Sequence, residues 1–99
     1  MADCGLGTVI ITGASRGIGR AIAVELSKTD MYGTAVLVAR SDEGLDETKS
    51  LMLTDNLNVL LEVVDIERYS EIIEMVERVR KRCGRIDALV NVAGYATPK

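Results

Sequence analysis

One stretch near the amino terminus decides the fold: residues 8–19, with the sequence TVIITGASRGIG. Residues Thr8 to Thr12 are all β-branched, which is typical of a buried strand. Glycines follow at positions 13, 17 and 19, and apolar side chains at helical spacing begin beside the last of them. Such a turn lets the backbone approach a phosphate closely, and the next helix offers free N–H groups and the positive end of its dipole. We therefore predict a nucleotide phosphate site between a strand and a helix.

The rest of the chain alternates between strand-like and helix-like segments. Short apolar runs predict strands at residues 34–39, 57–64 and 86–92, and amphipathic segments predict helices at residues 18–28, 42–53 and 70–83. Strands that alternate with helices form βαβ units and a parallel sheet. The predicted fold class is α/β: a Rossmann-like parallel sheet with helices on both faces, incomplete, with about four strands and three helices.

Local signals predict the helix ends and the buried helix faces. Ser41 or Asp42 is a suitable N-cap for the second helix, and Gly84 should end the third. At helical spacing, the apolar residues of the first helix are Ile18, Ile22 and Leu26, with the small Ala21. Those of the third helix are Ile72, Val76, Val79 and Cys83.

These elements make up only half of a doubly wound sheet, which has a second half beyond the ligand site. The strand at 86–92 should therefore lie at a sheet edge, where an apolar strand normally needs cover. We interpret residues 1–99 as the amino-terminal dinucleotide-binding part of a Rossmann domain, either a fragment or a truncated chain. Otherwise a partner must cover the edge, so a homo-oligomer stays possible.

Composition excludes several classes of function. The chain has 99 residues, 47% of them hydrophobic, with no Phe, Trp or His, so we expect an aliphatic core and no histidine-based metal or acid–base site. A net charge of −3 argues against a nucleic-acid surface, which needs a basic face. The two cysteines, Cys4 and Cys83, form no CxxC pair and are expected to be reduced thiols. The start MADCGLG is no secretory signal and no apolar run approaches membrane length, so a cytoplasmic protein without membrane contact is expected.

The glycine spacing is GxxxGxG rather than the commoner GxGxxG, and residues 12–19, TGASRGIG, resemble the TGxxxGxG signature of short-chain dehydrogenases/reductases. The resemblance extends over essentially the whole chain. Asp65, followed by Ile66, stands where that family has an Asp that hydrogen-bonds adenine. Residues 87–94, DALVNVAG, resemble the family segment D-x-L-V-N-N-A-G, but Val92 replaces the second Asn, so only Asn91, Ala93 and Gly94 match.

The resemblance implies a nicotinamide cofactor, and the arginines indicate which one. NAD-specific sites end the second strand with an acid that binds the ribose 2′-OH. Here that strand ends in Arg40, whose guanidinium suits a phosphate, and Arg16 lies in the loop where NADP-preferring relatives have a basic residue. NADP(H) is therefore favoured over NAD(H). The predicted cofactor-binding residues are Gly13, Ser15, Arg16, Gly17, Ile18, Gly19, Arg40, Asp65, Ile66, Asn91, Ala93 and Gly94.

We predict no catalytic residue in this chain. Relatives use a Ser and a helical Tyr-x-x-x-Lys pair, in which the Lys lowers the tyrosine pKa. Tyr95 and Lys99 match that spacing, but Pro98 disfavours a helix there and Gly94 directly precedes the segment. Two functions stay open. One is an NADP(H)-binding part of an oxidoreductase that transfers hydride between the cofactor and a carbonyl or alcohol. The other is a non-catalytic nucleotide-binding or assembly module from a shortened gene.

Overall fold

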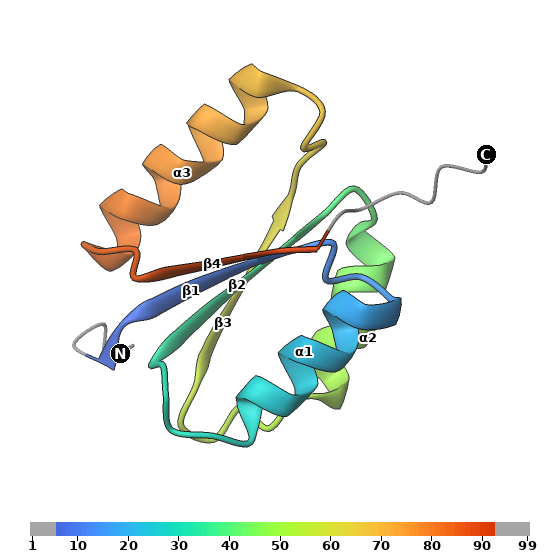
Figure 1. Cartoon of the computed structure of the whole chain (residues 1–99), viewed down its shortest axis with the longest axis vertical. Helices are drawn as coiled ribbons and strands as arrows, with labels where there is room; N and C mark the ends of the chain where they lie inside the picture. The colour runs from blue at the N-terminus through green and yellow to red at the C-terminus, as the bar shows by residue number, and fades with distance from the viewer. Residues whose placement is uncertain (1–5, 93–99) are drawn as a thin grey trace.

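The computed structural model describes residues 6–92 and has a four-stranded sheet with three helices in that range (Figure 1). The order along the chain is β1 (Thr8–Thr12), α1 (Gly17–Ser27), β2 (Thr34–Ala39), α2 (Asp42–Leu51), β3 (Asn58–Val63), α3 (Tyr69–Cys83) and β4 (Ala88–Asn91). The strands lie in the order β3-β2-β1-β4 and all pairs are parallel. The predicted parallel α/β sheet is confirmed.

The helices cover both faces of the sheet. Figure 1 shows α1 and α2 on one face and α3 on the other. Val9, Ile11 and Leu37 belong to the core on the α1–α2 side, because alternate residues of a strand point to opposite faces. The core on the α3 side contains Ile10 and Val36. Both strands β1 and β2 are buried along their whole length, as expected where a parallel sheet is covered on both faces.

The buried face of α1 differs from the predicted one. Its buried residues are Gly19, Ala23 and Ser27, whereas Ile18 is 71% exposed, Ala21 is exposed, and Ile22 and Leu26 are only partly buried. The reason is a close approach between α1 and the loop before it. A Cβ atom on Gly19 would lie 2.0 Å from the Gly13 carbonyl oxygen, so small residues face inward. Hydrophobic periodicity could not reveal this contact, because the residues that make it are small.

The helix ends agree more closely with the local signals. The Ser41 hydroxyl accepts a hydrogen bond from the Gly44 N–H at 2.9 Å, which selects Ser41 over Asp42 as the cap of α2. Gly84 ends α3 in the left-handed conformation, as predicted. The α2 helix ends at Leu51 rather than at 53, because the Leu53 N–H donates to the Ser27 hydroxyl instead of continuing the helix. The buried residues of α3 are Met75, Val79 and Cys83, whereas the predicted Ile72 and Val76 are only partly buried against the same core.

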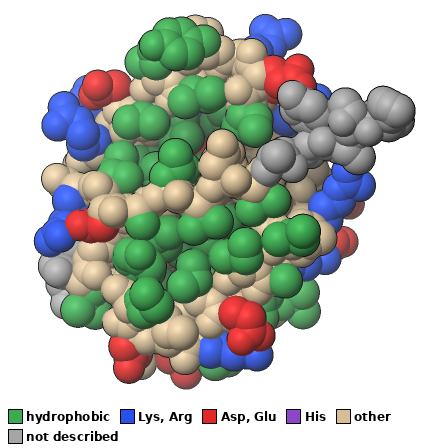
Figure 2. All heavy atoms as spheres, viewed as in Figure 1, with side chains coloured by type: hydrophobic (Ala, Val, Ile, Leu, Met, Phe, Trp, Pro, Cys, Tyr) green, Lys and Arg blue, Asp and Glu red, His purple; other side chains and the backbone are tan. Residues whose placement is uncertain are grey.

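The edge position of β4 is confirmed within the described residues. Leu89 in this strand is 63% exposed, while Ala88 and Val90 contact the core on the α1–α2 side. Figure 2 shows hydrophobic side chains gathered on this face of the molecule, on both sides of the line of β4 in Figure 1.

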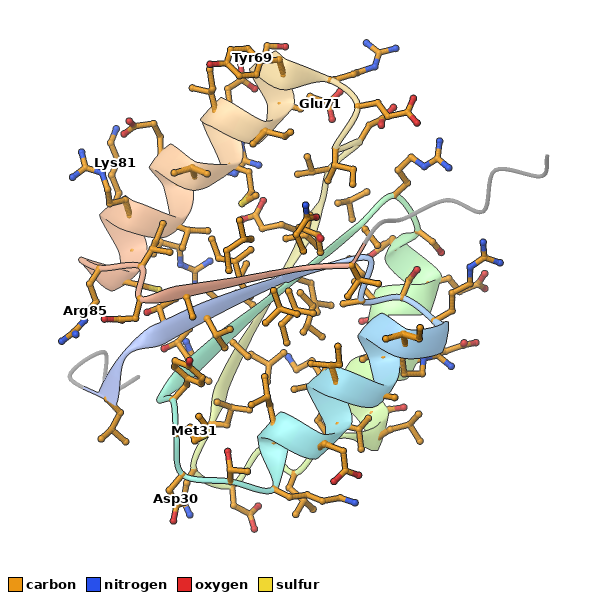
Figure 3. All side chains as sticks on the ribbon, viewed as in Figure 1. Asp30, Met31, Tyr69, Glu71, Lys81 and Arg85 are labelled. Atoms are coloured by element: carbon orange, nitrogen blue, oxygen red, sulfur yellow. The ribbon has the colours of Figure 1, made fainter. Side chains whose placement is uncertain are left out.

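A carboxylate joins the first residues of β1 to the segment before β4. The Asp87 carboxylate accepts the Thr8 N–H at 2.8 Å and forms a salt bridge with Arg85, which Figure 3 shows at the end of α3. The Arg85 guanidinium, and after it the Thr8 N–H, lowers the pKa of Asp87, because both stabilise the ionised form.

Asp87 should make stability depend on pH at the acidic end. Because its folded pKa is lowered, its contribution is complete above the unfolded pKa of about 3.9 and is lost as pH falls through the folded value. We expect Asp87→Asn to unfold at a lower urea concentration than the original protein at neutral pH. The difference between the two urea midpoints should shrink as the pH is lowered. Asp30→Asn, at an exposed turn position, is the matched control. A difference in urea midpoint that stays constant down to acid pH would contradict the stabilising role of the Asp87 carboxylate.

Candidate functional site

The loop between β1 and α1 contains two glycines in the left-handed conformation and leaves part of its backbone open. Gly13 and Gly17 both have positive φ, at 65° and 58°. Apart from Gly17 itself, its two chain neighbours and the nearby backbone of α1, no heavy atom lies within 4 Å of the place where a Cβ atom on Gly17 would be. The backbone at Gly17 is therefore open to an incoming group on that side, and a side chain there would occupy the open space.

Within residues 6–92, no side chain caps the amino terminus of α1. Its N-cap residue is Arg16, which makes no side-chain cap hydrogen bond, and the first turn contains no acidic residue. Between residues 6 and 92, no hydrogen bond is formed by the N–H of Ser15 or Arg16. By contrast, α2 has a serine cap and two acidic residues in its first turn. The start of α1 therefore offers unused N–H groups and a positive dipole end to an anion.

A pocket of about 490 Å³ opens between this loop and the carboxyl ends of β2 and β3. Six of the predicted binding residues line it: Gly13, Ser15, Arg16, Arg40, Asp65 and Ile66. Its other walls come from the first turns of α2 and from residues beside the predicted ones, namely Arg20, Ala39, Ser41, Glu43, Gly44, Glu47, Val64 and Glu67. Segments from three parts of the chain thus converge on one hollow at the carboxyl edge of the sheet.

Arg16 and Arg40 are both exposed at this pocket. In the part of the chain that the structure describes, neither guanidinium takes part in a hydrogen bond or an ion pair. By contrast, the Nε and Nη2 atoms of Arg20 in the same pocket donate to Thr48, Ser15, Gly44 and Glu47. The pocket therefore contains two cationic groups whose donors are available to a ligand.

Asp65 lines the pocket but also stabilises the turn after β3. Its carboxylate accepts the Glu67 N–H at 3.0 Å and lies 3.7 Å from the Arg68 guanidinium. Its own N–H donates to the Glu71 carboxylate at 3.0 Å. The side chain is 28% exposed, so part of it stays accessible from the pocket.

Asn91 lies away from the pocket, at the end of β4. Its side-chain oxygen accepts a hydrogen bond from the Thr12 hydroxyl at 2.8 Å, and that hydroxyl accepts the Val92 N–H at 3.1 Å. Thr12 and Asn91 therefore join the carboxyl ends of β1 and β4. A Cβ atom on Gly13 would lie 2.9 Å from the Val92 carbonyl oxygen, so these two segments touch. Ala93 and Gly94, together with the Tyr95 to Lys99 segment and Cys4, lie outside the described residues.

Of the other predicted loop residues, Gly17 and Ile18 are exposed at the start of α1, while Gly19 is buried against Gly13. None of these three lines the pocket itself.

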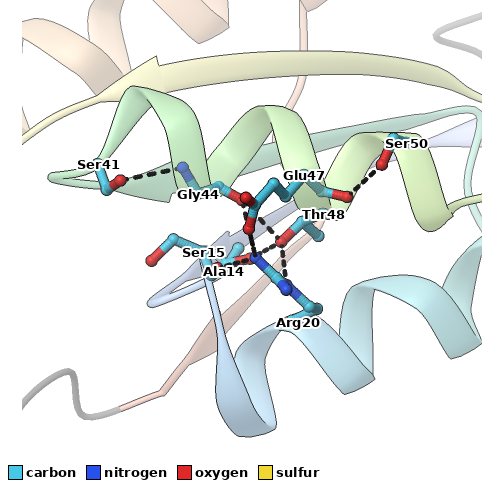
Figure 4. A network of polar contacts seen from close by, with 8 residues as sticks. All are labelled: Ala14, Ser15, Arg20, Ser41, Gly44, Glu47, Thr48 and Ser50. Carbon is cyan, nitrogen blue, oxygen red and sulfur yellow. Dashed lines mark hydrogen bonds and ion pairs between the residues drawn. The ribbon is translucent and has the colours of Figure 1, made fainter.

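A polar network that no sequence pattern indicated connects the loop to α2 (Figure 4). Arg20 donates to the Ser15 carbonyl at 2.5 Å, to the Gly44 carbonyl at 3.2 Å and to the Thr48 hydroxyl at 2.9 Å. It also forms a salt bridge with Glu47. The glycine at 44 was an available signal, since a glycine in a helix costs about 1 kcal/mol relative to alanine and calls for a reason.

No helix in residues 6–92 is long and apolar enough to span a membrane. Over the same range, no group of three or more potential metal ligands occurs.

Comparison with known proteins gives one family. The model of the short chain dehydrogenase family matches residues 7–99. An NADPH-dependent pterin aldehyde reductase of Arabidopsis thaliana is 40% identical over 87 residues, which cover 88% of this chain and 35% of the relative. The chain spans about a third of the length of the curated relatives it matches.

Solved structures agree with the fold. A metagenomic short-chain oxidoreductase in complex with NADP has a TM-score of 0.81 and 32% identity, over 91% of this chain and 40% of that one. An NAD⁺-bound xylitol dehydrogenase also has a TM-score of 0.81, with 27% identity, over 91% of this chain and 34% of that one. Both nicotinamide cofactors thus occur among proteins similar to this chain.

Proposed function

Because this chain belongs to the short-chain dehydrogenase family, a family of oxidoreductases that use nicotinamide cofactors, we propose that it binds NADP(H) in preference to NAD(H). The observation that carries this proposal is the pair of exposed arginines, Arg16 and Arg40, at the pocket beside the uncapped start of α1. The start of α1 would hold the pyrophosphate, and the two guanidinium groups would hold the 2′-phosphate of the adenosine ribose.

The polar groups at the end of β2 support this choice. The strand ends at Ala39 and is followed by Arg40, so no carboxylate stands at the position that would accept hydrogen bonds from a ribose 2′-OH. The Ser41 hydroxyl accepts from Gly44 and therefore still has its own proton to donate to a phosphate. Hydrogen bonds to a charged partner contribute about 1.5–3 kcal/mol each, so two arginines are enough for a strong preference.

Two carboxylates on α2, Glu43 and Glu47, line the same pocket and oppose an anionic ligand. Glu47 is paired with Arg20, which reduces its effect on a phosphate. Glu43 lies in the first turn of α2, next to the cap. The preference for NADP(H) therefore depends on Arg16 and Arg40 lying nearer to the phosphate than Glu43 does.

For the whole protein we propose hydride transfer between the nicotinamide and a carbonyl or alcohol substrate, with the cofactor supplying the redox chemistry. The described residues would bind and orient the cofactor, and the acid–base groups would come from elsewhere in the protein. The exposed Leu89 and the edge position of β4 support an arrangement in which further sheet and helix cover this edge. Residues 1–99 would then be the dinucleotide-binding part of a larger domain.

Calorimetric titration with NADP⁺ and NAD⁺ tests the proposed preference. We expect NADP⁺ to bind about 100-fold more tightly, since a difference of about 2.7 kcal/mol corresponds to that ratio. The titration should be repeated at raised ionic strength, where the preference should shrink because exposed charges are screened. Equal affinities for the two cofactors at low ionic strength would overturn the proposal.

A further inference from the structure

We propose that Arg20 and Thr48 are positioning residues that fix the phosphate loop against α2 and so aim its free N–H groups at the pyrophosphate. This inference rests on the proposed function, because it assigns a task to groups that do not reach the cofactor themselves. The residues that carry it form the Arg20–Thr48 network: Arg20, Gly44, Glu47, Thr48 and the carbonyl groups of Ala14 and Ser15 (Figure 4).

Thr48 is the buried centre of the network. It has no exposed surface, and its hydroxyl has two carbonyl oxygens in reach, that of Ala14 at 2.6 Å and that of Gly44 at 3.1 Å. A hydroxyl has a single proton, so it donates to the nearer Ala14 oxygen and uses a lone pair to accept the Arg20 Nε–H at 2.9 Å. The bonds therefore run in one direction, from Arg20 through Thr48 to the loop carbonyl.

Arg20 holds the next carbonyl group of the loop, that of Ser15, in a similar way. Its Nη2 atom donates to the Ser15 carbonyl on the loop and to the Gly44 carbonyl on α2. The side chain is only 26% exposed, and Glu47 balances its charge at 3.1 Å. An arginine whose Nε and Nη2 atoms both bind the protein has little freedom to turn towards a ligand, which separates Arg20 from Arg16 and Arg40.

The orientation of the N–H groups follows from peptide geometry. In a trans peptide the C=O of one residue and the N–H of the next point in opposite directions. The network turns the Ala14 and Ser15 carbonyls towards Thr48 and Arg20. The N–H groups of Ser15 and Arg16 are thereby turned away from Thr48 and Arg20, and they donate to no acceptor among residues 6–92. They are the groups that an anion at the start of α1 would meet.

Gly44 allows α2 to approach the loop between β1 and α1 closely. A Cβ atom at this position would lie 2.7 Å from the Ser15 Cβ atom and 3.1 Å from the Ser15 carbonyl oxygen. A glycine inside α2 weakens that helix, but it allows the first turn of α2 to contact the loop. The Arg20–Thr48 network and the contact between Gly44 and Ser15 thus both fix the peptide groups around Ser15.

Thr48→Val tests the proposal, because valine keeps the shape of threonine and removes the hydroxyl. We expect the dissociation constant for NADP⁺ to rise about tenfold, the effect of losing one hydrogen bond to a charged or buried group. Binding of adenosine 2′-phosphate, which has no pyrophosphate, should change by less than about twofold, because the long side chains of Arg16 and Arg40 adjust to a small backbone shift where fixed N–H groups do not. Thr48→Ser keeps the hydroxyl and should bind both ligands as the original protein does. Ser50→Ala, an exposed position on the same helix, is the matched control.

Hydrogen exchange of the ligand-free protein separates this inference from the proposed function. Thr48→Val should speed exchange of the Ala14 and Arg20 amides, which donate to the Val38 and Arg16 carbonyls, and leave the amides of residues 34–39 unchanged. If Thr48→Val does not fold, Gly44→Ala is the alternative variant, and it should also speed hydrogen exchange in the loop before α1. If the original protein does not bind NADP⁺, the proposed function fails, and the exchange data still decide whether the network orders the loop. Three results would each overturn the inference: equal loss of NADP⁺ and adenosine 2′-phosphate binding, a Thr48→Ser variant as weak as Thr48→Val, or unchanged exchange of the Ala14 and Arg20 amides.

Discussion

Gly17→Val is expected to abolish NADP(H) binding while the sheet stays folded. The valine side chain would project into the open space beside the start of α1, where the pyrophosphate is proposed to lie. It would block the approach of the phosphates without colliding with the protein, since no heavy atom lies within 4 Å of the added Cβ. The positive φ of 58° adds backbone strain of about 1–2 kcal/mol for a residue with a side chain. Calorimetry with NADP⁺, together with a urea unfolding curve, measures both effects.

Gly84→Val is the matched control for this experiment. Gly84 also has a positive φ, of 81°, and open space around its added Cβ, but it lies at the end of α3 and not at the start of α1. The control should lose a similar amount of stability and keep its affinity for NADP⁺. A folded Gly17→Val variant that binds normally, or a Gly84→Val variant that loses binding to the same extent, would show that the phosphates are placed wrongly.

Arg40→Asp is expected to reverse the cofactor preference. The change removes a guanidinium from the proposed 2′-phosphate position and places a carboxylate just after β2, where it can accept hydrogen bonds from a ribose 2′-OH and repel a phosphate. We expect the ratio of NADP⁺ to NAD⁺ affinity to fall about 100-fold or more, because an attraction of about 1.5–3 kcal/mol is replaced by a repulsion. Titration of the variant with both cofactors gives the ratio directly.

Arg80→Asp makes the same charge change on α3, away from the pocket, and should leave the ratio unaltered. If Arg40→Asp and Arg80→Asp lower NADP⁺ affinity equally, the effect of Arg40 comes from net charge and not from a contact with the 2′-phosphate.

The sequence was most informative where one local pattern dominates. Residues 8–12 and 34–39 are apolar runs with turns beside them, and both strands occur at the predicted bounds. Ser41 and Gly84 are local helix signals of the same kind. Such signals act through the nearest neighbours in the chain, so they can be interpreted without knowledge of the fold.

Contacts between distant segments were less predictable. The inward face of α1 is set by how closely Gly19 approaches Gly13, and side-chain hydrophobicity does not report that distance. Arg20 and Thr48 are 28 positions apart and each is an ordinary residue for a helix. Their role depends on α1 and α2 lying side by side on one face of the sheet, which no local pattern specifies. Asp65 was assigned to the site through the family resemblance and Arg40 through its place after the second strand, and the pocket brings the two together because the carboxyl ends of parallel strands share an edge.

The central claim is that the uncapped start of α1 holds the pyrophosphate of NADP(H). Amide chemical shifts of isotope-labelled protein, followed as NADP⁺ is added, test it most directly. We expect the largest changes at Ser15, Arg16, Gly17, Ile18 and Gly19, with smaller changes beside Arg40 and none on the exposed face of α3. Saturable binding that leaves the amides of residues 15–19 unshifted, or shifts centred on another part of the chain, would contradict it.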